Sequence, residues 1–292
     1  MAEITVALIK QLRDKTGAGI SKCKKALGEV DGDVNAAIDW LRKQDVKTSV
    51  ATRETSEGLI KAKVAGKKAA LIELQCETDF AARNEMFIEL VDKLLDAGFA
   101  AGAATDEALN AVEIDGQVAE QVIKTSINTI GENVRLTRFV TRTLDGEGLI
   151  GQYVHTNGKV GVLLGIQTGK AETADNEAVE TLGKHLCMHI AGAPIPPLAI
   201  TRDELDQDMI EKEKATLLEI MNNDPKDSKK PDNIKEKIIG GKMNRFFSER
   251  VLPEQKFVMD DKKSIKEVVE GVAKEVGDSL SLAWFERWEI GA

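Results

Sequence analysis

The spacing of apolar residues predicts helices in the first part of the chain. Within residues 1–52, apolar side chains recur every three or four positions, which is the period of an amphipathic helix. Thr5 and Asp33 each precede such a run and can cap a helix through a side-chain oxygen. Glycine-containing turns divide the segment, so we expect a compact module of three helices. The polar stretch 47–57 then indicates a linker.

After this linker the apolar pattern becomes that of strands. Residues 59–64 and 69–76 are rich in apolar side chains and flank Gly66-Lys67, a combination typical of a β-hairpin. The elements expected next are a helix from about residue 83, a second helix near 118–130 and a strand at 134–143.

The hairpin and its helix then recur in the sequence. The recurring pairs are Glu57-Gly58-Leu59-Ile60 with Glu147-Gly148-Leu149-Ile150, Gly66-Lys67 with Gly158-Lys159, and Asn84-Glu85 with Asn176-Glu177. A four-residue identity could arise by chance, but here the order of hairpin, turn and helix recurs as well. We therefore expect two structural units built to the same plan.

The last third of the chain predicts a helical hairpin and a closing helix and strand. Prolines at 194, 196 and 197 end the second unit's helix, and residues 202–250 carry charge on most helical faces. Thr201 with Glu204, and Ser264 with Glu267, have the spacing of capping boxes. The expected fold is α+β, with a three-helix domain at 1–52, a core subdomain at 53–143, a second core subdomain at 144–193 and 251–263, a protruding antiparallel helical hairpin at 194–250 and a C-terminal helix–strand module at 264–292.

Composition narrows the class of protein. The net charge of −9 argues against direct nucleic-acid binding, because neutralising phosphates requires clustered cations. The short lysine cluster at 22–25 is most simply a solvated helix face. Three scattered cysteines, with no apparent signal peptide and no apolar run long enough to cross a bilayer, predict a cytoplasmic protein without a membrane anchor.

Motifs for enzymatic chemistry are absent from the sequence. It has no glycine-rich phosphate loop, and no serine or cysteine stands in a recognisable nucleophile setting. His185 and His189 lie one helical turn apart beside Cys187, a spacing that can bind zinc, but no third ligand is apparent. We interpret these residues as part of a core and expect no metal and no other cofactor.

The tetrapeptide Glu77-Thr78-Asp79-Phe80 stands where an apolar strand ends and a helix begins. Asp79 could be only an N-cap and Phe80 only a hydrophobic staple, or the pair could meet a partner protein. The second unit has Lys170, Ala171 and Glu172 at the positions of Thr78, Asp79 and Phe80. A staple required by the shared fold would have left an apolar residue in place of Glu172, which favours the functional interpretation.

Two long motifs stand out in the sequence. The first is Leu12-Arg13-Asp14-Lys15-Thr16-Gly17-Ala18-Gly19 followed by Cys23-Lys24-Lys25-Ala26-Leu27, and the second is Glu77-Thr78-Asp79-Phe80-Ala81-Ala82-Arg83-Asn84. Both resemble the signatures of bacterial elongation factor Ts. The order of modules also agrees from end to end. The resemblance implies a ubiquitin-associated-like fold for the N-terminal module and a function in translation as a guanine nucleotide exchange factor for elongation factor Tu.

The resemblance also implies roles for individual residues. Thr78, Asp79, Phe80 and Ala81 match the segment that dislodges magnesium from elongation factor Tu, with Asp79 and Phe80 as its principal residues. Further residues expected at the partner interface are Leu12, Gly19, Ile20, Ser21, Lys24 and His155. No covalent chemistry is expected of this chain, and its assembly with elongation factor Tu could involve a homodimer or a 2:2 complex.

Two departures from the family pattern affect these expectations. Ala81 stands where the family commonly has Val, and Lys22 stands where it commonly has Asp before the cysteine. Two alternatives remain open at this point. One is a protein-binding scaffold that uses the three-helix module, and the other is a metalloenzyme that uses the helix of His185 and His189.

Overall fold

The N-terminal segment folds into the three predicted helices. The computed structural model describes residues 4–16, 18–43, 50, 52–226 and 228–291. Helices α1 (Val6–Thr16), α2 (Ile20–Glu29) and α3 (Val34–Lys43) pack around a small core of Leu12, Cys23, Ala26, Leu27 and Ala37. Asp33 caps α3, since its Oδ1 accepts a hydrogen bond from Asn35 N at 2.8 Å. Residues 47–49 and 51 of the predicted linker lie outside the described residues, and the likeness to a ubiquitin-associated fold stays a prediction.

The first core unit begins with the predicted hairpin. Its elements are β1 (Glu57–Ala65), β2 (Lys68–Cys76), α5 (Asp79–Ala82), α6 (Glu85–Ala101), α7 (Asp106–Asn110), β3 (Glu113–Ile114), β4 (Gln117–Val118), α8 (Ala119–Ile130) and β5 (Val134–Thr143). Strands β1, β2 and β5 form one antiparallel sheet in that order. The strand predicted at 134–143 is confirmed, whereas α7 and the β3–β4 hairpin were not predicted.

The second core unit repeats this plan. Its elements are β6 (Gly148–Val154), β7 (Val160–Thr168), α9 (Ala171–Ala174), α10 (Glu177–Gly192), β8 (Lys256–Phe257), β9 (Asp260–Ser264), α13 (Ile265–Val276) and β10 (Leu280–Glu289). Strands β6, β7 and β10 form the second antiparallel sheet. Residues 264–292, expected as a module of their own, thus contribute their strand to this sheet.

The duplication is therefore more extensive than the sequence indicated. Helices α8 and α13 have 12 residues each, both end at a left-handed glycine, and each leads into a closing strand of 10 residues. Each helix is also preceded by a small two-stranded ribbon, β3–β4 or β8–β9. In the second copy the helical hairpin is inserted between α10 and β8, and this insertion separates the two halves of the repeat.

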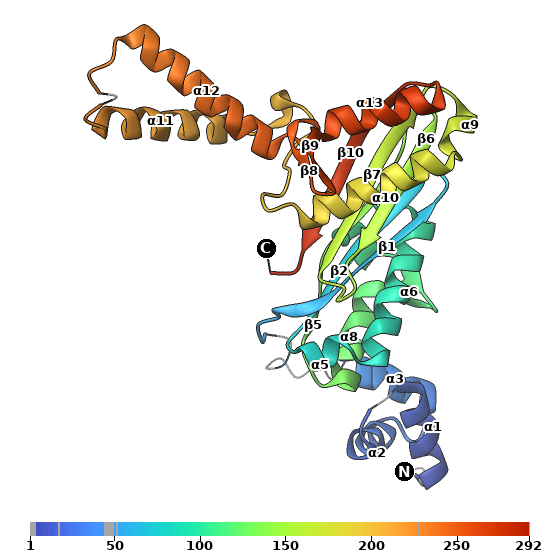
Figure 1. Ribbon diagram of the computed structural model, residues 1–292. Coiled ribbons are helices and arrows are strands. Elements are labelled where there is room, and N and C mark those ends of the chain that lie inside the picture. Colours follow the sequence, from blue (N-terminus) through green and yellow to red (C-terminus); the bar gives the residue numbers. More distant parts are fainter. Residues whose placement is uncertain (1–3, 17, 44–49, 51, 227, 292) are drawn as a thin grey trace.

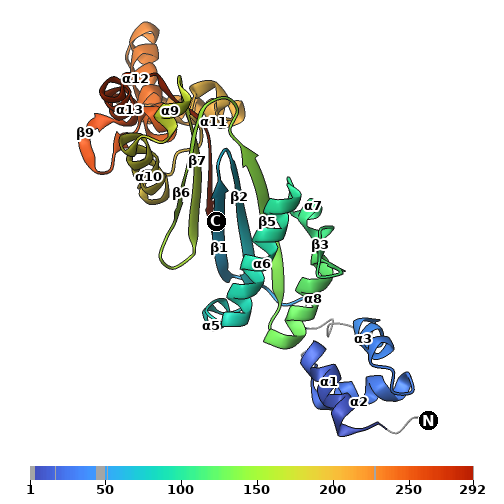
Figure 2. The ribbon, with the colours of Figure 1, turned by 90° about the vertical axis from the view of Figure 1, so that its right-hand side faces the viewer.

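The two sheets pack face to face, with helices on both outer faces (Figures 1 and 2). Alternation along each strand divides the apolar side chains between layers. In β2, for example, Leu71 joins the cluster between the sheets, whereas Ile72 faces the helices of its own unit. In β7, Leu163 and Leu164 divide in the same way. The result is a four-layer α/β/β/α core.

The repeated tetrapeptide has a structural reason in its glycine. Gly58 has φ 153°, and a Cβ built there would lie 2.2 Å from the carbonyl oxygen of Leu74. Gly148 has φ 146°, and its Cβ would lie 2.0 Å from the carbonyl oxygen of Ile166. In each unit the first strand crosses its neighbour too closely for any side chain at this position.

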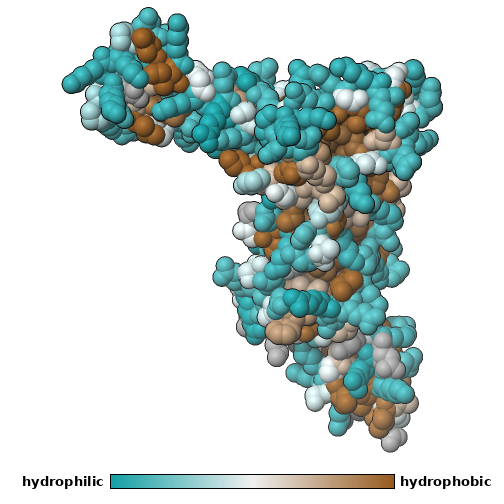
Figure 3. Space-filling view, viewed as in Figure 1, coloured by the Kyte–Doolittle hydropathy of each residue, from teal (hydrophilic) through white to brown (hydrophobic). Residues whose placement is uncertain are grey.

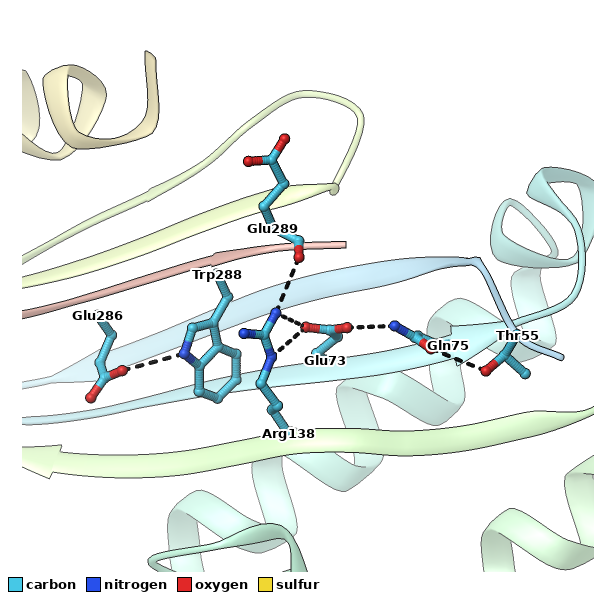
Figure 4. Close-up of polar contacts among 7 residues, drawn as sticks. All are labelled: Thr55, Glu73, Gln75, Arg138, Glu286, Trp288 and Glu289. Atoms are coloured by element: carbon cyan, nitrogen blue, oxygen red, sulfur yellow. Dashed lines mark hydrogen bonds and ion pairs between the residues drawn. The ribbon is translucent and has the colours of Figure 1, made fainter. Parts of the chain in front are cut away.

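A polar network lies between the two sheets (Figure 4). Glu73 is only 1% exposed and accepts a hydrogen bond from Arg138 Nε at 2.7 Å. The Arg138 guanidinium also donates to the carbonyl oxygen of Glu289 at 3.1 Å and lies over the Trp288 ring. The equivalents of Glu73 and Arg138 in the second sheet are Gly165 and Trp284, which face each other across β7 and β10. One copy thus fills this site with an ion pair and the other with an indole ring.

The helical hairpin projects from the body, as the sequence predicted (Figure 1). It consists of α11 (Gln207–Asn223) and α12 (Asp232–Arg250), which pack through a narrow apolar seam that includes Leu217 and Met243. The capping box of Thr201 and Glu204 opens a short 3-10 turn, Arg202–Glu204, and α11 itself is capped by Asp206. Apolar surface remains visible over these helices in Figure 3. Among the helices of the described residues, none is long and apolar enough to span a bilayer.

Candidate functional site

The candidate site is the short helix α5 at the end of β2, where Phe80 is exposed to solvent. Phe80 is 83% exposed, although the two residues that follow it, Ala81 and Ala82, are buried against the first core. Thr78 caps the helix, because its Oγ1 accepts a hydrogen bond from Ala81 N at 3.2 Å. The backbone under Phe80 is therefore anchored while its aromatic ring points into solvent.

The interpretation of Asp79 as only an N-cap and of Phe80 as only a hydrophobic staple is wrong for both residues. The N-cap is Thr78, and Asp79 is the first residue of the helix. The Asp79 carboxylate instead pairs with Arg83, with 3.1 Å between Oδ2 and Nη2, in an i,i+4 pair on the exposed side. A hydrophobic staple would bury its side chain against the helix it opens, and Phe80 does not do so.

The strand end beneath the site is buried. Cys76 is buried, and its thiol donates to the carbonyl oxygen of Thr78 at 3.2 Å. Burial, together with the nearby Glu132 carboxylate, raises the pKa of the Cys76 thiol to about 12. This cysteine is thus a packed, protonated residue and not a nucleophile.

The duplicated unit provides an internal comparison for the site. Helix α9 has the same four-residue length as α5, and Lys170 occupies its N-cap position. The residue at the place of Phe80 is Glu172, and it is exposed as well. This position is therefore exposed to solvent in both units, and the fold accommodates a charged side chain there. An exposed phenylalanine is a costly choice that packing within the chain does not require.

The residues predicted from the first motif divide between surface and core. Ile20 is 58% exposed at the start of α2, and Gly19, Ser21 and Lys24 are also exposed beside it. Leu12, by contrast, is fully buried among the three helices. Its predicted role in partner contact is therefore corrected to a role in the core of the module, which explains its apolar character without a partner.

His155 lies on the turn between β6 and β7, at the same end of the sandwich as the candidate site. It is exposed, and its Nδ1 lies 2.9 Å from the hydroxyl oxygen of Tyr153. Lys159 of the same turn pairs with Glu57, whose strand partner is Cys76 at the end of β2. Two elements from different units thus meet at the end of the body that carries Phe80.

The histidine helix lacks the features of a metal site. His189 is buried, with Nε2 2.9 Å from Gln255 Oε1 and Nδ1 accepting from Val258 N at 3.3 Å. Burial lowers the pKa of His189, so the ring is neutral with both nitrogens occupied. Cys187 faces the second core, and the described residues contain no group of three or more side chains suited to a metal ion. These contacts favour the core interpretation over the metalloenzyme.

Comparisons with known proteins identify the family of the chain. The family described as Elongation factor TS matches residues 77–292, a span that begins one residue before Thr78. The chain is 39% identical to elongation factor Ts of Desulfovibrio desulfuricans over the full length of both proteins. The chain belongs to the elongation factor Ts family. It is also 39% identical to the elongation factor Ts of Nitratidesulfovibrio vulgaris, over 99% of this chain and 96% of the relative, and 35% identical to that of Wolinella succinogenes, over 100% and 95%.

The family model begins at residue 77, but the relatives align over nearly the full chain, so the similarity includes the N-terminal module. It supports the predicted place of this protein in translation elongation.

Two residues that shape the site were not singled out from the sequence: Arg83, which pairs with Asp79, and Glu132, which contacts Thr78. Glu132 had a sequence signal, since an acidic residue follows the helix-ending glycine in both units, at Glu132 and Asp278.

Proposed function

We propose that this protein is a guanine nucleotide exchange factor for elongation factor Tu, with Phe80 as the side chain that enters the GTPase. The observation that carries the proposal is an exposed phenylalanine on an anchored helix, at a position where the duplicated unit has Glu172. Fully burying such a ring in a partner stabilises a complex by about 1.5–3 kcal/mol. An apolar partner surface is therefore the natural counterpart of Phe80.

Exchange in this proposal follows from preferential binding. GTPases hold their nucleotide through phosphate contacts and a magnesium ion. If Phe80 inserts between elements that support these contacts, the complex favours the nucleotide-free GTPase, and linkage then requires that nucleotide binds more weakly. Asp79 and Thr78 fix the direction of the ring, and Ala81 sits buried behind it. The exposed residues Ile20, Ser21 and Lys24, with Gly19, provide a second contact, and His155 a third.

Release of fluorescent GDP from elongation factor Tu, with and without this protein, tests the proposal. We expect Phe80→Ala to slow the stimulated release by at least about tenfold, the factor that corresponds to the lower end of the burial energy. Asp79→Ala should slow release less, because it removes only an orienting ion pair. Glu172→Ala is the matched control, since it truncates the equivalent exposed residue of the second unit.

The same assay separates this proposal from the scaffold alternative. A scaffold that recruits another protein through the three-helix module would not accelerate GDP release from elongation factor Tu, and Phe80→Ala would leave the rate of release unchanged. Normal exchange by a folded Phe80→Ala protein would overturn the proposal that Phe80 enters the GTPase. Melting temperatures of all variants show whether any loss of activity reflects unfolding.

A further inference from the structure

The helix that carries Phe80 is held by a carboxylate from a distant part of the chain. Glu132 lies in the short connection between α8 and β5. Its Oε2 accepts a hydrogen bond from Thr78 N at 3.0 Å, and its Oε1 accepts one from Thr78 Oγ1 at 2.7 Å. Both hydrogen-bond donors of the N-cap residue are therefore held by one side chain, with charge-assisted hydrogen bonds of the stronger kind.

A second set of hydrogen bonds runs in the opposite direction. The Glu77 carboxylate accepts from Asn133 N at 2.6 Å, and Asn133 Nδ2 donates to the carbonyl oxygen of Arg53 at 2.6 Å. Asn133 is itself buried. Residues 77 and 78 at the end of β2 are thus joined to residues 132 and 133 by a reciprocal clamp. On each side a carboxylate accepts a hydrogen bond from a backbone N–H of the other side.

The second unit has a reduced form of the same clamp. Asp278 occupies the place of Glu132, and its Oδ2 accepts from Lys170 N at 2.9 Å. The reciprocal carboxylate is missing, since Gly169 stands at the position of Glu77 and is held only by a backbone hydrogen bond to Ser279. One carboxylate contact is thus common to the two units, and the unit that carries the exposed phenylalanine has a second carboxylate in its connection.

We propose that Glu132 is a positioning residue that fixes α5, so that Phe80 can displace elements of its partner without itself being pushed back. A side chain that enters a packed protein meets resistance, because close-packed interiors deform little. The helix under Phe80 has four residues and could tilt if only its own cap held it. The Glu132 carboxylate opposes that tilt from the side of α8 and β5.

This inference rests on the proposed function, and the test keeps the two apart. GDP release from elongation factor Tu is measured over a range of concentrations of the full-length protein carrying Glu132→Ala, Glu132→Gln, Phe80→Ala or Asp278→Ala. We expect Glu132→Ala to lower the maximal rate of release about tenfold, while the half-saturating concentration changes by less than about threefold. Glu132→Gln keeps one acceptor for Thr78 N and should recover part of the rate.

Asp278→Ala serves as the structural control, because it removes the equivalent carboxylate from the unit without the phenylalanine. We expect it to lower the melting temperature about as much as Glu132→Ala and to leave the maximal rate unchanged. If Phe80→Ala is slow but Glu132→Ala reaches the wild-type maximal rate, the positioning role of Glu132 is wrong, and the proposed role of Phe80 stands. If both variants exchange at the wild-type rate, the proposed function of Phe80 has failed as well.

Discussion

Lys67 Nζ lies 2.8 Å from Glu147 Oε2, which joins the turn of the first hairpin to the start of the second unit. Lys159 and Glu57 form the reciprocal ion pair. Lys67 and Lys159 occupy the same place in the two copies, and so do Glu57 and Glu147. The two units therefore meet through an approximately self-complementary surface, as in a twofold-symmetric dimer, although they belong to one chain.

These reciprocal pairs contribute little to stability. Both side chains of the Lys67–Glu147 pair are more than one third exposed, and such pairs contribute at most about 1 kcal/mol. We expect Lys67→Ala and Lys159→Ala each to lower the free energy of unfolding in urea by less than about 1 kcal/mol. A loss of several kcal/mol in either variant would show that the ion pairs and not the apolar cluster hold the sheets together.

The Glu73–Arg138 ion pair of the first unit should behave differently, because its carboxylate is buried. Removing Arg138 leaves the Glu73 carboxylate almost fully buried without its cation, a change that typically costs about 3–5 kcal/mol. We expect Arg138→Ala to reduce stability on this scale in denaturant unfolding. The double variant Glu73→Leu with Arg138→Met should recover much of the loss, because the equivalent place in the second unit is filled by Trp284 and no ions. A double variant less stable than Arg138→Ala would contradict this explanation.

The repeated glycines provide a prediction about backbone geometry. At Gly148 an added Cβ would overlap the carbonyl oxygen of Ile166, and φ lies at 146°. We expect Gly148→Ala to lower the free energy of unfolding by at least about 1–3 kcal/mol. Gly271→Ala is the control, since Gly271 lies inside α13 with no atom within 4 Å of its Cβ position, and alanine there should stabilise the helix by about 1 kcal/mol.

The period of apolar residues was sufficient to predict the hairpins, the main helices and the strand Val134–Thr143. It did not reveal the second half of the duplication, because the inserted helical hairpin separates α10 from α13 and no identical run marks the pair α8 and α13. The equivalence of these two helices is visible only in the structure, from the helix lengths, the glycine turns that end them and the pairing of the strands that follow. The short α7 and the β3–β4 ribbon lacked a periodic signal of sufficient length.

At the candidate site the sequence identified the correct tetrapeptide but not its internal roles. Thr78 and Asp79 are both residues that cap helices, and only the hydrogen bond from Ala81 N shows that Thr78 does so. Leu12 shows another limit of the sequence. An apolar residue in a motif can face a core or a partner, and only the packing of the helices shows that Leu12 faces the core. The Glu132 contact joins residues far apart in sequence, which local patterns do not encode.

The buried histidine of the second unit predicts a dependence of stability on pH. Burial lowers the pKa of His189 in the folded protein, whereas the unfolded chain has a pKa of about 6.5. Below that value the unfolded state therefore binds more protons than the folded state, and the free energy of unfolding falls as pH decreases. Above that pH, His189 is neutral in both states and does not change the free energy of unfolding with pH.

Urea unfolding between pH 5 and pH 8 measures this effect. We expect the wild type to lose stability below about pH 6.5, and His189→Gln to lose less over the same range, since glutamine can still donate to Gln255 but cannot be protonated. His155→Gln is the matched control, because it makes the same substitution at a histidine that is exposed on the β6–β7 turn. Equal slopes for wild type and His189→Gln would mean that other groups cause the acid sensitivity.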